Sequence, residues 1–196
     1  TRGGDGSLSV TAGEGLELAD LQTLLEKAAT LPGGIADLTL ADVTPLSAGT
    51  VIDNTYDATA KFLSAEGDSR TIGHDAFNFN QFLTVTDDRY LTLVGQSRVD
   101  TSDSTTETFG ADGSYSKTLA HLDNDYNAAT AKLTSATGYS DTEGHDAFDF
   151  NRFITRTDDV YDAELIRTTG QARVDTSTSR TLTRGVDGSL SVTAGE

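Results

Sequence analysis

Aspartates in expected turns are the side chains of this sequence best suited to chemistry, because grouped carboxylates can hold a cation. The candidates are Asp87, Asp88, Asp112, Asp123, Asp125, Asp158, Asp159 and Asp187. Ca²⁺ takes about six to eight oxygen ligands, which carboxylates, Asn side chains and backbone carbonyls of loops provide. None of these stretches matches a known calcium-loop pattern, however, and Asp is also common in turns because it hydrogen-bonds nearby backbone. Two interpretations therefore stay open: calcium ligands, or residues that shape turns.

An octapeptide that contains histidine occurs twice, as GHDAFNFN at 73–80 and GHDAFDFN at 144–151. In a strand, the alternation of side chains would place a polar strip on the face opposite a Phe pair. The strip would offer a metal only one His and one carboxamide or carboxylate, which are too few ligands for a transition metal. We therefore expect Phe77 and Phe79 to fill the core and Gly-His-Asp to form a turn.

No arrangement of residues predicts catalysis. The chain has no Cys, and its three His, at positions 74, 121 and 145, match no catalytic triad or nucleophile-elbow pattern. The Asp-Asp pairs at 87–88 and 158–159 could do acid-base work. Both pairs are expected at hairpin tips, where Asp is a common turn residue. We therefore expect a protein that is not an enzyme.

The elements that must position these residues are repeated. Residues 1–14, TRGGDGSLSVTAGE, match residues 183–196, TRGVDGSLSVTAGE, at 13 of 14 positions, which gives a repeat spacing of 182 residues. The chain also contains no Met, even at position 1. We therefore expect a piece of a longer protein that repeats this unit in tandem, with residues 1–14 as the closing strand of the preceding unit.

A second repeat divides the unit into two related modules. Short motifs such as DNTY at 53–56 and DNDY at 123–126 recur with offsets of 70 to 75 residues. The unit is therefore predicted to consist of an insert at 15–52, a first module at 53–122 and a second, related module at 123–196.

Both modules are predicted to be β-structure. They are poor in helix formers and rich in Thr, Val, Ile, Phe and Tyr, which favour strands. The runs 81–94 and 152–168 are each expected to form two strands around a turn, and Gly-x-Asp-Gly at 110–113 and 185–188 to turn two further hairpins. The predicted fold is mainly β, with antiparallel hairpin-rich modules that form a sandwich or a meander.

The insert is predicted to differ from the modules. Apolar residues follow helical spacing within 15–31, and a Pro-Gly-Gly sequence ends the pattern. The apolar stripe consists of Leu18, Leu21, Leu25 and Ala28. A helix of this length is marginal alone, so we expect this amphipathic helix to dock on a module or on a neighbouring unit. Residues 34–46 alternate apolar and polar and are expected to form an edge strand that ends at Pro45.

The chain is strongly acidic. It carries 14 Lys and Arg against 31 Asp and Glu, which gives a net charge of −17 and a pI of about 4.3. Such a surface repels phosphate backbones and anionic lipid, so nucleic-acid partners and membrane surfaces are excluded. No apolar run is long enough to span a membrane. Many carboxylates and few Lys favour a secreted protein that is extracellular or on the cell surface, where salt screens their repulsion.

The long near-identical repeats, the acidic β-rich composition and the lack of Cys resemble the extender region of giant bacterial surface adhesins and biofilm-associated secreted proteins. The resemblance covers the whole chain in composition and periodicity. It implies calcium-rigidified spacers that project a ligand-binding tip, with the loop aspartates as calcium ligands. The helix in each unit and the lack of a recognisable calcium motif depart from that pattern.

We therefore expect a structural unit of an adhesin stalk, biofilm matrix or surface layer, whose partners are neighbouring units of the same chain. Two alternatives stay open. A carbohydrate- or surface-binding module would hold a glycan or another surface with exposed Thr, Asn and Tyr side chains. A subunit of an extracellular fibre or phage-like appendage would exchange residues 1–14 between neighbours.

Overall fold

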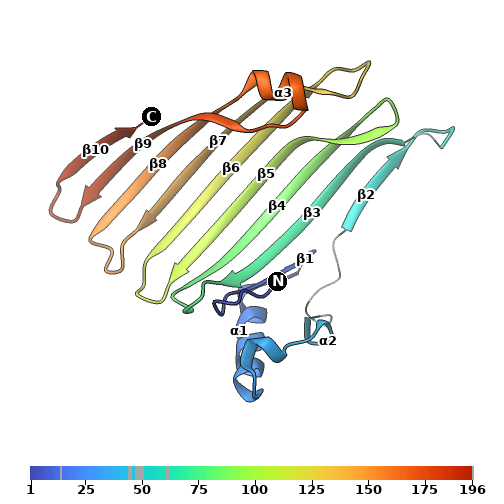
Figure 1. Ribbon diagram of the computed structural model, residues 1–196. Helices are drawn as coiled ribbons and strands as arrows, with labels where there is room; N and C mark the ends of the chain where they lie inside the picture. The colour runs from blue at the N-terminus through green and yellow to red at the C-terminus, as the bar shows by residue number, and fades with distance from the viewer. Residues whose placement is uncertain (14, 44–45, 47–50, 61, 196) are drawn as a thin grey trace.

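The structure, a computed structural model, describes residues 1–13, 15–43, 46, 51–60 and 62–195 (Figure 1). The strands are β1 (Leu8–Ala12), β2 (Val51–Tyr56), β3 (Phe62–His74), β4 (Asn80–Leu93), β5 (Gln96–Gly110), β6 (Tyr115–Tyr126), β7 (Leu133–His145), β8 (Asn151–Tyr161), β9 (Val174–Gly185) and β10 (Leu190–Gly195). The helical elements are α1 (Leu18–Thr30), the 3₁₀ turn η1 (Gly34–Asp37), α2 (Leu40–Val43) and α3 (Ala163–Thr169). The chain is therefore mainly β, as predicted.

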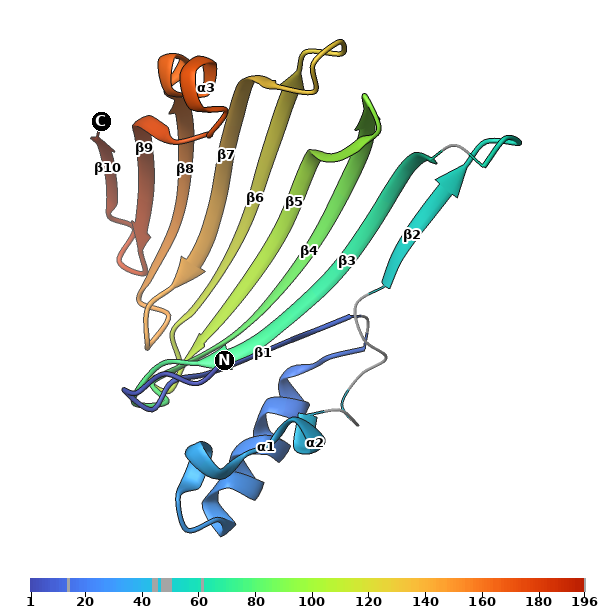
Figure 2. The ribbon, with the colours of Figure 1, turned by 45° about the vertical axis from the view of Figure 1, so that its right-hand side comes forward.

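All ten strands belong to one antiparallel sheet. From β3 to β10 each strand pairs with the next along the chain, so the modules form a meander, and the sandwich alternative is wrong. β1 and β2 both pair with β3, along the side that faces away from β4. The sheet is open and curved, and the two chain ends lie at its opposite edges (Figure 1, Figure 2).

The core lies where α1 covers the β1 edge of the sheet. Leu21, Leu24 and Ala28 of the helix are buried with Val10 of β1 and Ile72 of β3. The predicted amphipathic helix is thus confirmed. Its buried stripe also includes Leu24, which is not part of the predicted stripe, while Leu18 and Leu25 are partly buried at the sides of the stripe. The helix is fixed at its start by an ion pair of 2.6 Å between Glu17 and Arg70 of β3.

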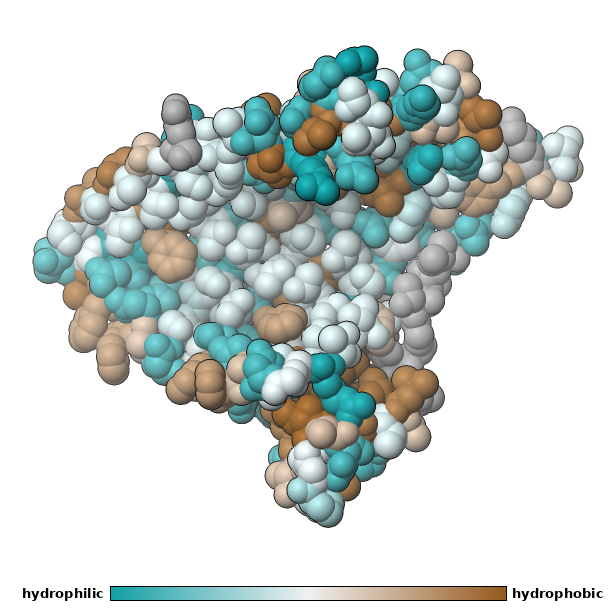
Figure 3. All heavy atoms as spheres, in the orientation of Figure 1, coloured by the Kyte–Doolittle hydropathy of each residue, from teal (hydrophilic) through white to brown (hydrophobic). Residues whose placement is uncertain are grey.

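On the sheet face opposite α1, rows of hydroxyl side chains join neighbouring strands. Nine strands each contribute one threonine to a continuous row of directly opposite residues. The row consists of Thr11, Thr71, Thr84, Thr106, Thr118, Thr142, Thr155, Thr181 and Thr193. Within the row, Thr118 and Thr142 join their hydroxyls at 2.9 Å, and three other pairs do so at 2.8 to 2.9 Å. Cross-strand pairs of this kind stabilise a sheet. The sheet face in Figure 3 is of intermediate hydropathy over its centre, as Thr, Ser and Gly are.

Two of the predicted turn positions are wrong. Asp87 and Asp88 lie inside the continuous strand β4, and Asp158 and Asp159 lie inside β8. In both strands the ladder continues through the aspartates: Asp88, Asp158 and Asp159 lie opposite serine or threonine, whereas Asp87 lies opposite Asp103. The hairpins predicted at 110–113 and 185–188 are confirmed, and in each the glycine before the serine has the positive φ.

Two predicted strands are helical. Residues 164–168 belong to α3, because Asp162 accepts hydrogen bonds from the N–H groups of Glu164 and Leu165 at 2.9 Å and Gly170 ends the helix with φ of 72°. The edge strand predicted at 34–46 is replaced by η1 and α2. Asp42 in α2 forms an ion pair with Lys27 of α1, which draws this segment onto the helix. Pro45 lies outside the described residues.

Candidate functional site: the two ends of the sheet

Asp112 and Asp187, two of the predicted calcium ligands, shape equivalent turns. The Oδ1 atom of each accepts the backbone N–H of the serine two residues on, at 2.9 Å. Hydrogen bonds from Ser114 and Ser189 hold the pKa of these carboxyls below its usual range. A carboxylate that closes its own turn in this way matches the second of the two interpretations, a residue that shapes a turn.

Asp158 and Asp159 are separated by the sheet, because successive side chains of a strand point to opposite faces. Asp158 forms ion pairs with Arg156 at 2.9 Å and with Arg180 at 3.2 Å. These two arginines lower the pKa of Asp158. On the other face, Asp159 accepts a hydrogen bond from Ser177 at 2.7 Å. The pair therefore does not offer two carboxylates to one ligand.

Asp87 lies in a row of aspartates on three neighbouring strands. Its cross-strand neighbours are Asp68 on β3 and Asp103 on β5. A hydrogen bond with Asp68 raises the pKa of Asp87, and burial and the charges of Asp68, Asp103 and Asp88 raise it further. Asp103 is in turn 2.6 Å from His121 Nδ1. This row is the place where like charges are most concentrated around one of the predicted ligands.

Asp123 and Asp125, the last predicted ligands, lie in β6. Asp123 is opposite Thr137 of β7, and Asp125 accepts a hydrogen bond from Ser135 at 2.7 Å. Within the part of the chain that the structure describes, no three His, Cys, Asp or Glu side chains are arranged to hold a metal ion. The structure thus distributes the eight aspartates over the sheet, and calcium binding stays a prediction.

The repeated octapeptide forms an exposed turn. Phe77 and Phe79 are 79 % and 63 % exposed, so the predicted Phe pair in the core is wrong. Asp75 holds the turn together, since it accepts hydrogen bonds from the Phe79 N–H and from the Asn80 side chain, both at 2.8 Å. These hydrogen bonds close the turn, and the two phenyl rings lie on its outer side, exposed to solvent. The second copy repeats the same bonds from its own aspartate.

The pairing registers show that one strand position is split by the insert. β1 begins opposite His74 of β3, and β6 begins opposite His145, the equivalent residue of β7. β2 ends at Tyr56 and β6 at Tyr126, again opposite equivalent residues of β3 and β7. β6 therefore covers in one strand the positions that β1 and β2 share. The sheet repeats a pattern of four strand positions, and β10 begins the pattern for a third time.

The turns at one end of the strands show the same repetition. A methyl group placed on Gly6 would lie 3.1 Å from the carbonyl oxygen of Ala76, and one on Gly113 would lie 3.0 Å from that of Ala147. These equivalent turns are therefore packed closely, and a side chain is not accommodated. A methyl group placed on Gly188, the third equivalent glycine, would meet no described atom within 4 Å other than those of its chain neighbours. The turn before β10 thus lacks the neighbour that its two counterparts have.

The two ends of the sheet carry the same hairpin. Thr1 and Arg2 lie beside β1 as Thr183 and Arg184 lie beside β10, with the same register in both copies. β1 pairs on its other edge with β3. β10 pairs only with β9 among the described strands.

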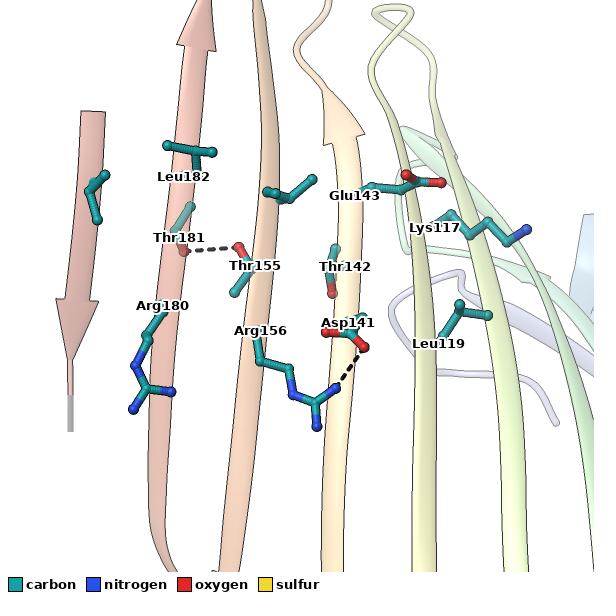
Figure 4. A pocket seen from close by; sticks show the side chains of 12 residues that line it. Lys117, Leu119, Asp141, Thr142, Glu143, Thr155, Arg156, Arg180, Thr181 and Leu182 are labelled. Atoms are coloured by element: carbon teal, nitrogen blue, oxygen red, sulfur yellow. Dashed lines mark hydrogen bonds and ion pairs between the residues drawn. The ribbon is translucent and has the colours of Figure 1, made fainter. Parts of the chain in front are cut away.

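An apolar groove lies beside β10 (Figure 4). Its volume is about 430 Å³, and its apolar lining comes from Leu119 of β6, Ile154 of β8, Leu182 of β9 and Val192 of β10. Charged residues border it, among them Arg156, which binds Asp141 at 2.7 Å. Val192 is the counterpart of Val10, which α1 covers, so the groove lies on the face that carries the helix at the other end of the sheet.

The residues that line the groove were not among the predicted site residues. A signal for two of them was present, because Leu182 stands between two threonines in its strand and Val192 stands in a copy of the hairpin whose other copy is in the core. Recognition required the strand order, since these residues come from separate hairpins.

Comparison with protein-family models, with curated proteins and with solved structures finds no match for this chain. No helix in the described ranges is long and apolar enough to cross a membrane. The two ends of the sheet and the groove beside β10 are therefore the features from which we infer a function.

Proposed function

We propose that the chain is a structural tandem-repeat unit of a large extracellular protein, such as an adhesin stalk, a biofilm matrix or a surface layer. The observation that carries this proposal is the split strand position. β6 repeats the positions of β1 and β2, and β10 begins the same pattern again. One unit therefore fills eight strand positions of a sheet whose pattern can continue into the next unit.

An extended sheet of this kind suits a spacer. Neighbouring strands are joined by a continuous backbone ladder and by the threonine row, both of which run across the strands from one edge to the other. Strands lie about 4.8 Å apart, so each unit of eight positions adds about 38 Å in this direction. The unit would thus lengthen an array without a change of its cross-section.

The acidic, lysine-poor composition supports a place outside the cell, where salt screens the repulsion between carboxylates. The proposal does not depend on calcium, because the turn aspartates are engaged by neighbouring serines. Its partners are the neighbouring units of the array.

Small-angle X-ray scattering of chains with one, two and three units tests the proposal. Successive units would be joined so that residue 15 of one follows residue 196 of the previous one. We expect the maximum dimension to rise by about 38 Å per added unit while the cross-section stays constant. A cross-section that grows with the number of units would overturn the spacer function.

A further inference from the structure

The residues of β1 and β10 are identical, but their environments are opposite. Both strands belong to the sequence LSVTAG. Leu8 is 5 % exposed and Val10 is 6 % exposed, whereas Leu190 is 66 % exposed and Val192 is 72 % exposed. Since the sequences are the same, the difference comes from what lies beside each strand.

Two elements cover β1. Along its edge, β3 pairs with it from Leu8 opposite His74 to Ala12 opposite Arg70. On its apolar face, α1 packs Leu21 and Leu24 into the same cluster. At β10 the described chain supplies neither element, and the groove along Val192 stands open.

We infer that the free edge of β10 and the groove beside it bind a second copy of this chain, through that copy's β3 and α1. This inference rests on the proposed function and specifies its junction. The register is the one that β1 and β3 show, with Leu190 opposite His74 and Val192 opposite Ile72 of the second copy. The hairpin of the first copy takes the place of residues 1–14 in the second, so that one hairpin belongs to both units.

The surroundings of β10 contain counterparts for the other contacts of the N-terminal hairpin. The guanidinium of Arg2 donates hydrogen bonds to the carbonyls of Ile35 and Ala36, beside α1, and Arg184 is its counterpart at the C-terminal hairpin. The open space at Gly188 matches the place where Ala76 lies beside Gly6. The second copy would lose the contacts that its own residues 1–14 make. The C-terminal hairpin of the first copy would replace them with equivalent contacts.

The threonine row provides a distance-specific test. Thr11 and Thr71 have their hydroxyls 2.8 Å apart and exposed, and Thr193 is the counterpart of Thr11. The chain has no Cys, so an introduced pair reacts without background. In a chain of two units, Thr193→Cys in the first unit and Thr71→Cys in the second are expected to form a disulfide on mild oxidation, detected by mass spectrometry.

Two control pairs calibrate this experiment. The pair Thr11→Cys and Thr71→Cys in the single chain should link, because the structure places these residues together. The pair Thr193→Cys and Thr142→Cys of the second unit should not, because Thr142 is in the same row but on β7. If the first control links and the Thr193–Thr71 pair does not, or if Thr193 links equally to Thr142, the junction is wrong.

A second measurement uses no covalent link. Val192→Asp is expected to leave the melting temperature of the single chain within about 1 °C, because its side chain is exposed, and to lower that of the two-unit chain by several degrees. Ser191→Asp, whose side chain points to the opposite face, is the matched control. Equal effects of Val192→Asp on the two chains would overturn the inference.

The junction and the spacer function can fail separately. A two-unit chain that lengthens in scattering but forms no Thr193–Thr71 disulfide would leave the spacer function standing and reject this junction. A disulfide without lengthening would establish the junction and reject the spacer function.

Discussion

Ala12 and Val51 lie next to each other along β3, opposite two residues of that strand that are only two positions apart, although the whole helical insert separates them in the sequence. In β6 the equivalent positions are Leu119 and His121, which have a single residue between them. The insert therefore interrupts what is a single continuous strand in the second module. Its helix α1 returns to cover the apolar face of the strand that it interrupts.

Val10 and Val192 should respond differently to the same substitution. Val10→Asp places a carboxylate in the core under α1 and is expected to destabilise the single chain by about 3 kcal/mol or more. Val192→Asp is expected to change the stability by less than about 0.5 kcal/mol, since Val192 is exposed. Urea unfolding of the two variants measures the difference. Comparable destabilisation by both would mean that β10 is covered within the single chain.

The threonine row should contribute measurably to stability. Thr118→Val removes one partner of the hydroxyl pair with Thr142 and is expected to cost about 0.5 to 1 kcal/mol. Thr142→Val should add little to it, because the pair is already broken, and a double-mutant cycle gives the coupling. Thr193→Val is the control, because its hydroxyl has no partner among the described residues. Strict additivity of the two substitutions would show that the pair contributes nothing.

The aspartate row predicts how stability depends on pH. The pKa of Asp87 is raised in the folded chain, so its ionised form is disfavoured there and reduces stability at neutral pH. As pH falls through the raised value toward the ordinary range near about 4, the penalty disappears. Asp87→Asn is therefore expected to raise stability at pH 7, by less than about 1 kcal/mol because the site is exposed, and to lose this advantage at low pH.

Thermal melts at pH 7 and at pH 4 for the wild type, Asp87→Asn and Asp88→Asn check this prediction. Asp88 carries the same charge but points to the other face of the sheet, so its gain should be smaller. An Asp87→Asn variant that is less stable than the wild type at pH 7 would mean that the carboxylate makes a favourable contact instead.

The two interpretations of the predicted calcium ligands, as ligands or as residues with structural contacts, differ in the expected effect of calcium on stability. The turn aspartates are bonded to serines, and Asp158 is bonded to two arginines. If these structural contacts are the only role of the aspartates, melts in millimolar CaCl₂ and MgCl₂ should coincide and should differ from a melt in EDTA only through screening. A calcium site occupied at a hundred times its Kd would add about 2.7 kcal/mol, so a shift with calcium alone would restore the loop aspartates as ligands.

The sequence predicts the periodic parts of this fold better than the turns. Alternation and the paired Gly-x-Asp-Gly motifs locate the hairpins, and leucine spacing locates α1. The prediction placed Asp87 and Asp158 in turns because Asp is favoured there, whereas the backbone ladder runs through both residues in continuous strands. The α3 helix was missed although Asp162 and Gly170 are good helix-capping residues, because its β-rich surroundings suggested a strand.

The candidate site depended on information that a single repeat sequence does not contain. The identity of residues 1–14 and 183–196 predicts equivalent strands, but it does not tell which partner each strand has. The pairing of β1 with β3 supplies that partner, and the exposure of Val192 shows which copy lacks it. Ile154 and Leu182 become neighbours of Val192 only through the strand order.

Hydrogen exchange of β10 tests the central claim, that the last strand of one unit is the first strand of the next. The N–H and the carbonyl of Ser9 are hydrogen-bonded to Thr1, so the N–H of the next residue, Val10, points to the other edge, toward β3. In the equivalent strand β10, the N–H of Val192 points to the free edge. The shared LSVTAG sequence makes the two strands internal standards for each other.

In the single chain, the outward N–H groups of β10 are expected to exchange much faster than those of β1. In a two-unit chain, the junction copy is expected to exchange as slowly as β1 does, because β3 and α1 of the second unit cover it. Fast exchange at the junction of a folded two-unit chain would contradict the claim, since each sheet would then end at its own edge.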